Sequence, residues 1–395
     1  MTHPTKAIYN YVLLDYVKIS NIGNGDILYD ESDLSYSMDK IIPIRFHEEI
    51  EYDGVKFKAY NAGHVLGAAM FLVEIDGVRI LYTGDYSREE DRHLRAAEIP
   101  KCEIDILIVE STYGKNIHEP RQIREDKFKK RVHEIIRNGG KCLLPVFALG
   151  RAQELLLILN EYWKEHEELQ NVPIYYAGSL AQKSLSVFRT YRNMMGDAVR
   201  KKIDQGENPF HFENNENYME DKPLVIMATP GMLQNGLSRE LFEKWCEDEK
   251  NGIVFTGYSV EGTLAKQVMN KPSEIPTADK KKQLKLNMTV EVISFSAHCD
   301  FKQTSHFIKK LRPPNIILVH GDQNEMAKLK KELEHIYKEE VNVLSPRNCQ
   351  TVKFNFITYK SAKFVGKRMK DVFKPNPKKQ DFTVSKEIFD EIAKC

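Results

Sequence analysis

The 395-residue sequence contains no long apolar run. Although 42% of the residues are hydrophobic, none of the apolar stretches reaches the roughly 20 residues that a helix needs to cross a bilayer. The N-terminal residues also lack the hydrophobic region of a secretory signal. We therefore expect no membrane-spanning segment and no membrane partner.

Cysteine is scarce, and its spacing is irregular. The six cysteines include no C-x-x-C pair, which argues against a cysteine-based zinc finger. Scattered cysteines without an evident disulfide framework are typical of a reducing compartment, the cytosol or the nucleus. They are Cys102, Cys142, Cys246, Cys299, Cys349 and Cys395.

The sequence has almost no net charge. Its 58 Lys and Arg balance 57 Asp and Glu, which gives +1, so no overall field attracts a polyanion. Nucleic-acid binding would then depend on local basic patches. Short basic runs occur at 200–202, 280–282 and 367–370, and each is either such a patch or only a solvated face.

The order of the apolar runs predicts more than one domain. A chain of 395 residues exceeds the size at which one core usually keeps growing. After an amphipathic helix predicted over Thr5–Val17, the middle of the chain alternates short apolar runs with helical patterns, as in Cys142–Val146 followed by Arg151–His166. Such βαβ units predict a parallel sheet covered on both faces. Lys271–Lys285 has the composition of a loop or domain boundary.

Glycine is present in several of the strand-to-helix loops of this middle region. Backbone N–H groups at a helix N-terminus can bind phosphate, so these loops fit a phosphate-bearing ligand, although ordinary turn chemistry explains any one of them equally well. No G-x-G-x-x-G or P-loop motif occurs, so no nucleotide cofactor is indicated. The loops are FALGRAQE, YAGSLAQK, ATPGMLQNGLS and TGYSVEGTLAK.

Polar side chains lie at the ends of apolar runs in the first third of the chain. Asp76-Gly77 predicts a tight hairpin between two such runs, the second of which ends near Asp85. His64 and Glu110 lie at the ends of two other runs. A buried carboxylate such as that of Glu110 needs a facing cation or donor, so this pattern indicates a metal or catalytic site.

The same pattern returns near the end of the chain. The predicted strand Val290–Phe295 leads into His298, and Asn315–Val319 leads into His320. Imidazoles and carboxylates are zinc ligands, and two metals can clamp the oxygens of a phosphodiester. A further histidine held by a glutamate is a general acid near neutral pH. These residue types favour metal-assisted phosphodiester hydrolysis, but leave open which histidine is ligand and which is acid.

Eight motifs resemble those of the metallo-β-lactamase/β-CASP nucleases. The likeness extends over nearly the whole chain and is strongest to the endonuclease subunits of the cleavage and polyadenylation specificity factor. The motifs are AGHVLGAAMF, LYTGDYSREEDRHL, ILIVESTYG, PVFALGRAQELLLIL, PGMLQNGLSRELFE, GYSVEGTLAK, ISFSAHCD and LVHGDQNEM.

The resemblance implies an α/β fold in which an αββα metallo-β-lactamase domain, incomplete at its N-terminus, is interrupted by a Rossmann-like β-CASP domain. We expect the first metallo-β-lactamase segment at residues 1–114 and the β-CASP domain at 115–287. The second metallo-β-lactamase segment would follow at 288–371, and a C-terminal tail at 372–395.

The family motifs also imply roles for the five residues. His64 would be a ligand of one zinc, Asp85 the carboxylate that bridges two zincs, and His320 a ligand of the other. Glu110 would orient His298, the general acid that protonates the leaving 3′ oxygen. A histidine at 320, where the DNA-repair branch typically has valine, favours an RNA substrate.

The implied function is zinc-dependent endoribonuclease cleavage of pre-mRNA at its 3′ end before polyadenylation, in the nucleus. The implied partners are pre-mRNA and other subunits of the cleavage and polyadenylation complex, including a catalytically inactive paralogue.

The family's H-x-H-x-D-H motif, which supplies four metal ligands, is absent, and no H-x-H occurs anywhere in the sequence. The chain begins as if just downstream of this motif. Two protein ligands then remain for each metal, with Asp85 counted for both, whereas zinc sites normally have three or four. We therefore expect this chain to bind zinc weakly or not at all and not to cleave RNA.

Three interpretations follow. The chain is a truncated form of the active polyadenylation endonuclease, a non-catalytic paralogue that binds RNA or partner subunits, or another β-CASP ribonuclease such as the Integrator nuclease or a bacterial-type exoribonuclease. Retention of all five candidate residues favours the first over the second. Unbroken similarity from His64 to Glu325 favours the first over the third.

Overall fold

The structure is a computed structural model that describes residues 1–22, 28–207, 222–257 and 259–356. The chain divides into a unit of residues 1–353 and a second unit that begins at Phe354. The predicted tail at 372–395, the last part of the predicted second metallo-β-lactamase segment and the basic run at 367–370 lie outside the described residues.

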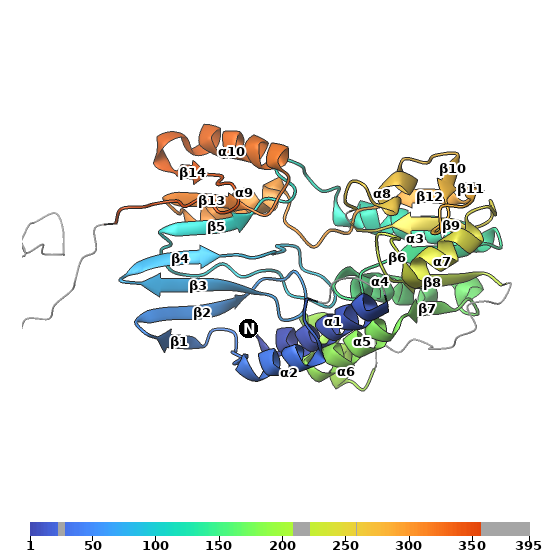
Figure 1. The fold of residues 1–395 in the computed structure, drawn as a ribbon, viewed down its shortest axis with the longest axis horizontal. Coiled ribbons are helices and arrows are strands. Elements are labelled where there is room, and N and C mark those ends of the chain that lie inside the picture. Colours follow the sequence, from blue (N-terminus) through green and yellow to red (C-terminus); the bar gives the residue numbers. More distant parts are fainter. Residues whose placement is uncertain (23–27, 208–221, 258, 357–395) are drawn as a thin grey trace, which may run out of the picture. The chain divides into compact units, whose positions relative to one another are not determined.

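The first sheet joins segments from both ends of the first unit (Figure 1). Its strands β1 to β4 pair antiparallel, whereas β4, β5, β13 and β14 pair parallel. In sheet order they are β1 (Glu49–Tyr52), β2 (Val55–Asn61), β3 (Ala69–Ile75), β4 (Val78–Tyr82), β5 (Ile106–Glu110), β13 (Asn315–Val319) and β14 (Asn342–Leu344). The helices α9 (Phe301–Leu311) and α10 (Gln323–Tyr337) pack on this sheet through Phe307, Leu329 and Leu333.

The second sheet is entirely parallel, as the βαβ pattern predicts. Its order is β12 (Thr289–Val292), β9 (Gly252–Phe255), β6 (Lys141–Pro145), β8 (Leu224–Ala228) and β7 (Ile174–Ala177). The connecting helices are α3 (Arg121–Arg137), α4 (Arg151–Glu165), α5 (Ser179–Thr190), α6 (Asp197–Asp204), α7 (Gly236–Trp245) and α8 (Leu264–Met269). The predicted α/β class is confirmed.

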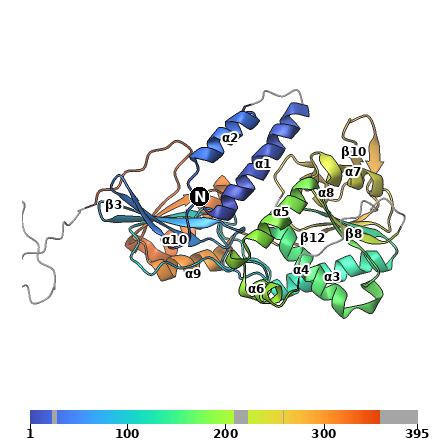
Figure 2. The same ribbon diagram turned by 90° about the horizontal axis from the view of Figure 1, so that it is seen from below.

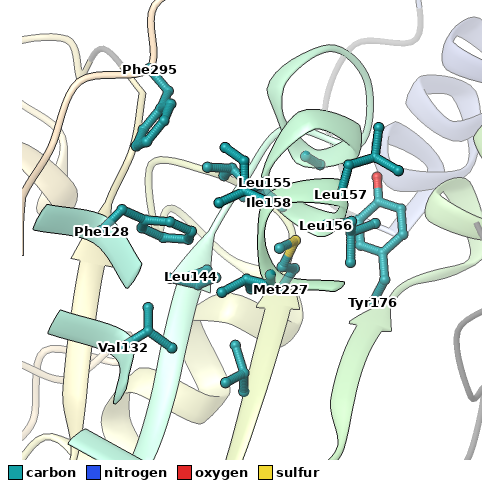
Figure 3. Close-up of a cluster of buried hydrophobic side chains, with 14 of the residues drawn as sticks. Phe128, Val132, Leu144, Leu155, Leu156, Leu157, Ile158, Tyr176, Met227 and Phe295 are labelled. Carbon is teal, nitrogen blue, oxygen red and sulfur yellow. The ribbon is translucent and has the colours of Figure 1, made fainter. Parts of the chain in front are cut away.

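Alternate residues of these buried strands face opposite layers of helices. Leu144 of β6 and Met227 of β8 join a core with α3 and α4, whereas Leu143 and Ile226 join a core with α7 and α8. Figure 3 shows the first core, where side chains of α3 and α4 gather around Leu144 and Met227. This double covering explains why these strands are apolar throughout rather than alternating.

The predicted hairpin is confirmed. Strands β3 and β4 pair antiparallel from Ile75 and Val78 outward. The two linking residues, Asp76 and Gly77, have φ of 49° and 82°, the left-handed values that a two-residue turn of this kind requires. The hairpin places the end of β4 next to β5, with which β4 pairs in parallel.

Two local expectations were incomplete or wrong. The stretch predicted as a loop at Lys271–Lys285 contains the antiparallel pair β10 (Glu274–Pro276) and β11 (Gln283–Lys285). Each strand has three residues, which is too few to show the alternation of apolar and polar residues that predicts a strand. The polar helix α2 (Glu31–Lys40) was not predicted, although Asp30 caps it through a capping box.

The N-terminal helix α1 (His3–Ile22) extends further than predicted. It packs beside α5, as Figure 2 shows, and its Ala7, Ile8 and Tyr11 contact the core of the second sheet. None of the helices in the described ranges has the length and apolarity needed to cross a bilayer.

Candidate metal centre

The five candidate residues lie at strand ends or in the loops that follow strands. Glu110 is the last residue of β5, and His320 directly follows β13. Asp85 lies in the loop after β4, His64 in the loop after β2, and His298 in the segment between β12 and α9. Because β4, β5 and β13 are parallel neighbours, their carboxyl ends meet at one edge of the sheet.

Asp85 lies between two histidines. Its Oδ2 is 3.8 Å from His64 Nε2, and its Oδ1 is 3.4 Å from His320 Nε2. Ligand atoms around a tetrahedral zinc are about 3.3 Å apart when each zinc–ligand distance is about 2.0–2.1 Å. The two carboxylate oxygens thus face two separate imidazole nitrogens at spacings close to those of a metal site.

Hydrogen bonding sets the orientation of His64. Its Nδ1 lies 3.0 Å from the carbonyl oxygen of Ala297, which can only accept, so Nδ1 carries the hydrogen and Nε2 offers a lone pair toward Asp85. Such an outer hydrogen bond is typical of metal-binding histidines. Burial and the nearby charge of His298 lower the pKa of His64, which favours the neutral ring.

His298 is held by Glu110 rather than by Asp85. The Nδ1–H of His298 donates to Glu110 Oε1 at 2.8 Å. Burial alone would lower the pKa of His298, but the hydrogen bond and charge of Glu110 outweigh it and raise that pKa. Burial would likewise raise the pKa of Glu110, but the hydrogen bond and charge of His298 lower it, with help from Thr112 and Tyr86.

His298 also lies close to the other two residues of the cluster. One ligand atom each of His64, Asp85 and His298 lies within 4.8 Å of the others. The ring centroids of His298 and His64 are 4.7 Å apart, and those of His298 and His320 are 5.9 Å apart. All five predicted residues are therefore in one place, with His298 positioned either to contact a metal or to act beside it.

The chain turns at His320, directly after β13. Its φ is 49°, a left-handed value that is uncommon for residues other than glycine. Ser111 donates its backbone N–H to the carbonyl of His320 at 3.1 Å, so the residue after Glu110 fixes this turn.

Two histidines outside the group of five make defined side-chain contacts. His118 Nε2 donates to the carbonyl oxygen of His298 at 3.1 Å, and its ring packs edge-on against Tyr113. His93 is fully buried, and its Nδ1 is 2.9 Å from Glu154 Oε2. Neither follows a strand, so the pattern that identified the other histidines could not identify these.

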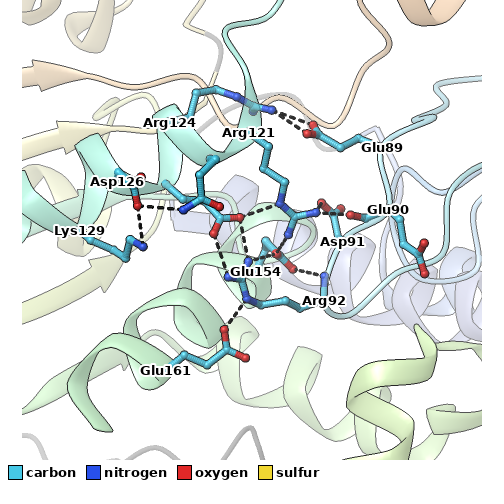
Figure 4. A network of polar contacts seen from close by, with 12 residues as sticks. Glu89, Glu90, Asp91, Arg92, Arg121, Arg124, Asp126, Lys129, Glu154 and Glu161 are labelled. Atoms are coloured by element: carbon cyan, nitrogen blue, oxygen red, sulfur yellow. Dashed lines mark hydrogen bonds and ion pairs between the residues drawn. The ribbon is translucent and has the colours of Figure 1, made fainter. Parts of the chain in front are cut away.

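An ionic network joins the loop after Asp85 to helices α3 and α4 (Figure 4). Arg92 of this loop is 2.8 Å from Glu125, 2.9 Å from Glu154 and 2.6 Å from Glu161. Arg121 of α3 contacts Glu125 and Glu154, both at 2.6 Å. The loop that carries the central carboxylate is thus tied to the helices of the second sheet.

Glu154 is the most buried carboxylate of this network, with its side chain 2% exposed. Burial would raise its pKa, but the hydrogen bond and charge of His93 and the charges of Arg121 and Arg92 lower that pKa to about 2. Glu154 is therefore ionised at neutral pH and depends on its cationic neighbours.

A loop of the second sheet reaches the candidate metal centre. Gly150, at the start of α4, has φ of 101°, and a Cβ built on it would lie 3.2 Å from the side chain of Val65, the residue after His64. Of the other glycine-bearing loops, two lead into α5 and α7, where Gly178 and Gly236 also have positive φ. The loop before α8 contains Tyr258, which lies outside the described residues.

The donor set fits zinc. Two imidazoles and a carboxylate with both oxygens directed at them are zinc-type ligands, and the outer hydrogen bond to His64 is already in place.

Three family models match the sequence. The metallo-beta-lactamase superfamily domain matches residues 1–110, the Beta-Casp domain matches 152–268, and the Zn-dependent metallo-hydrolase RNA specificity domain matches 283–344. The first and third matches hold all five candidate residues.

Curated relatives are similar over almost all of this chain. It is 53% identical to "Cleavage and polyadenylation specificity factor subunit 3" of Dictyostelium discoideum, with 98% of this chain and 51% of the relative covered. It is 55% identical to "Cleavage and polyadenylation specificity factor 73" of Drosophila melanogaster, with 93% and 55% covered. It is 51% identical to "Endoribonuclease ysh1" of Schizosaccharomyces pombe, with 93% and 49% covered. The chain thus spans about half the length of these relatives.

Proposed function

Since this chain belongs to the metallo-β-lactamase/β-CASP family, we propose that it is part of a zinc-dependent endoribonuclease that cleaves pre-mRNA at its 3′ end before polyadenylation. The observation that carries the proposal is the carboxylate of Asp85 between His64 and His320, next to the His298–Glu110 pair.

In this proposal His64 and His320 would each hold one zinc ion, and Asp85 would offer one carboxylate oxygen to each ion. When bound, the ions supply Lewis-acid stabilisation of the phosphodiester oxygens. In its protonated form His298 carries a second proton on Nε2, since its Nδ1–H is donated to Glu110. It passes this proton to the leaving 3′ oxygen. Glu110 acts as a positioning residue that holds the ring and favours its protonated form.

The glycine-bearing loops of the second sheet would hold the RNA backbone. The loop at Gly150 lies against Val65 and so is next to His64. Backbone N–H groups at the N-terminus of α4 could then bind a phosphate beside the metal centre. Such contacts position a strand without reading its bases.

The names of the relatives support membership of a cleavage and polyadenylation complex, and we propose its other subunits, including a catalytically inactive paralogue, as partners in the nucleus. We also propose the predicted domain division, with boundaries near residues 114 and 288. The pairing of β12 with β9 leaves the first residues after 288 in the second sheet.

RNA cleavage by two forms of the protein tests this function. The 395-residue chain offers two protein ligands to each zinc and is expected to show no cleavage of a single-stranded RNA in the presence of zinc, because zinc sites normally have three or four ligands. The same chain joined to an H-x-H-x-D-H segment from a relative is expected to cleave that RNA internally.

The sizes of the RNA fragments on a denaturing gel distinguish an endoribonuclease from a non-catalytic paralogue and from an exoribonuclease. Absence of cleavage by the extended form, with zinc bound, would favour the non-catalytic paralogue. Products released one nucleotide at a time would favour an exoribonuclease of the same family.

A further inference from the structure

A second group of metal-type side chains lies on the domain of the second sheet. His133 on α3, His166 at the end of α4, and Glu168 in the short helix Glu167–Leu169 each offer one ligand atom within 4.8 Å of the others. His166 and Glu168 are two residues apart in the sequence, and the packing of α3 beside α4 brings His133 to them.

Tyr162 is a hydrogen-bond partner of both imidazoles. His166 Nδ1 lies 2.9 Å from the backbone carbonyl of Tyr162, so Nδ1 is the donor and Nε2 keeps its lone pair. The Tyr162 hydroxyl lies 2.9 Å from His133 Nδ1 and can accept its hydrogen. Outer hydrogen bonds of this kind fix the tautomer and the ring orientation of metal-binding histidines.

The spacing of the ligand atoms suits a small divalent ion. His133 Nε2 is 3.5 Å from Glu168 Oε1, close to the separation of about 3.3 Å between ligand atoms on a tetrahedral zinc. The rings of His133 and His166 are perpendicular, with centroids 5.5 Å apart. The Glu168 side chain is 59% exposed, so an ion can reach the group from solvent.

The charge of the lysine beside Tyr162 is paired with a carboxylate. Lys129 lies 5.9 Å from the centre of the Tyr162 ring, but its ammonium is paired with Asp126 at 2.8 Å.

We propose that His133, His166 and Glu168 form a zinc-type site separate from the metal centre at Asp85. An ion there would link α3 to the end of α4 and to the segment that follows α4. Because three protein ligands leave the fourth position of a tetrahedral zinc to water or to an outside ligand, the site could also accept a side chain from a partner.

Equilibrium dialysis against micromolar zinc at neutral pH, followed by metal analysis, tests this site. Untagged protein with Asp85→Asn is the starting form, because that change removes the shared ligand of the other centre. We expect about one zinc per chain. Adding Glu168→Gln should weaken zinc binding by more than about tenfold, the loss that even an outer partner of a metal ligand produces.

Glu167→Gln in the same background is the matched control. Glu167 is an exposed neighbour in the same short helix and outside the ligand group, so its change removes equal charge without removing a ligand. His166→Gln should behave as Glu168→Gln does. Equal zinc binding by the Glu167 and Glu168 variants, or no zinc in the starting form, would overturn the proposal. Neither result depends on RNA cleavage.

Discussion

Replacement of His298 by alanine is expected to reduce RNA cleavage by at least about 100-fold, the usual contribution of a general acid, while zinc content stays unchanged. The variant is made in the chain joined to an H-x-H-x-D-H segment. The expectation follows from the 2.8 Å hydrogen bond to Glu110, which occupies Nδ1, and from the raised pKa of His298, which favours the protonated ring with its second proton on Nε2.

His306→Ala is the control for this variant. His306 is an exposed histidine of α9 and should affect neither cleavage nor zinc. If His298→Ala loses zinc together with cleavage, His298 is a ligand and not the acid. A ligand atom of His298 lies within 4.8 Å of ligand atoms of His64 and Asp85, so its position suits a metal ligand as well as a general acid. The zinc content of His298→Ala decides between these two roles.

Replacement of Arg92 by methionine is expected to lower the free energy of unfolding by about 3 kcal/mol, because removing one partner leaves a buried charge uncompensated. Arg92 is the shared partner of three carboxylates, and Glu154 among them is almost completely buried. Arg121 still contacts Glu154 at 2.6 Å, which limits the loss to the lower end of the usual range. Urea unfolding at neutral pH measures the difference.

Arg95 in the same loop provides the comparison. Its ion pair with Asp197 has a length of 2.6 Å, but both side chains are about half exposed, and exposed pairs contribute at most about 1 kcal/mol. Arg95→Met should therefore change stability much less than Arg92→Met. Equal losses from the two variants would mean that the network of Figure 4 behaves as a surface network.

The sequence allowed the candidate site to be predicted because its residues follow a simple rule. Asp85, Glu110 and His320 lie at or just beyond the ends of parallel strands, and apolar runs reveal strands and their ends. His64 and His298 follow apolar runs in the same way. The structure brings the five together, while their individual roles remain predictions.

The ionic network and the second histidine group could not be predicted in this way. Glu154 contacts His93 from 61 positions away, and such pairings leave no local period in a sequence. His133 and His166 lie on and at the end of helices, where a histidine resembles any other polar residue. The helix α2 carried a cap signal at Asp30, but its polar sequence showed no apolar stripe.

The central claim is that two zinc ions share Asp85. Its most direct test is the number of zinc ions bound by the chain joined to an H-x-H-x-D-H segment, measured with and without Asp85→Asn. If Asp85 bridges two ions between His64 and His320, the change should remove a ligand from both, and zinc should fall from about two ions per chain to less than one. The change must be made with the site at His133, His166 and Glu168 disabled by Glu168→Gln. Retention of both ions in the Asp85 variant would contradict the proposed metal centre.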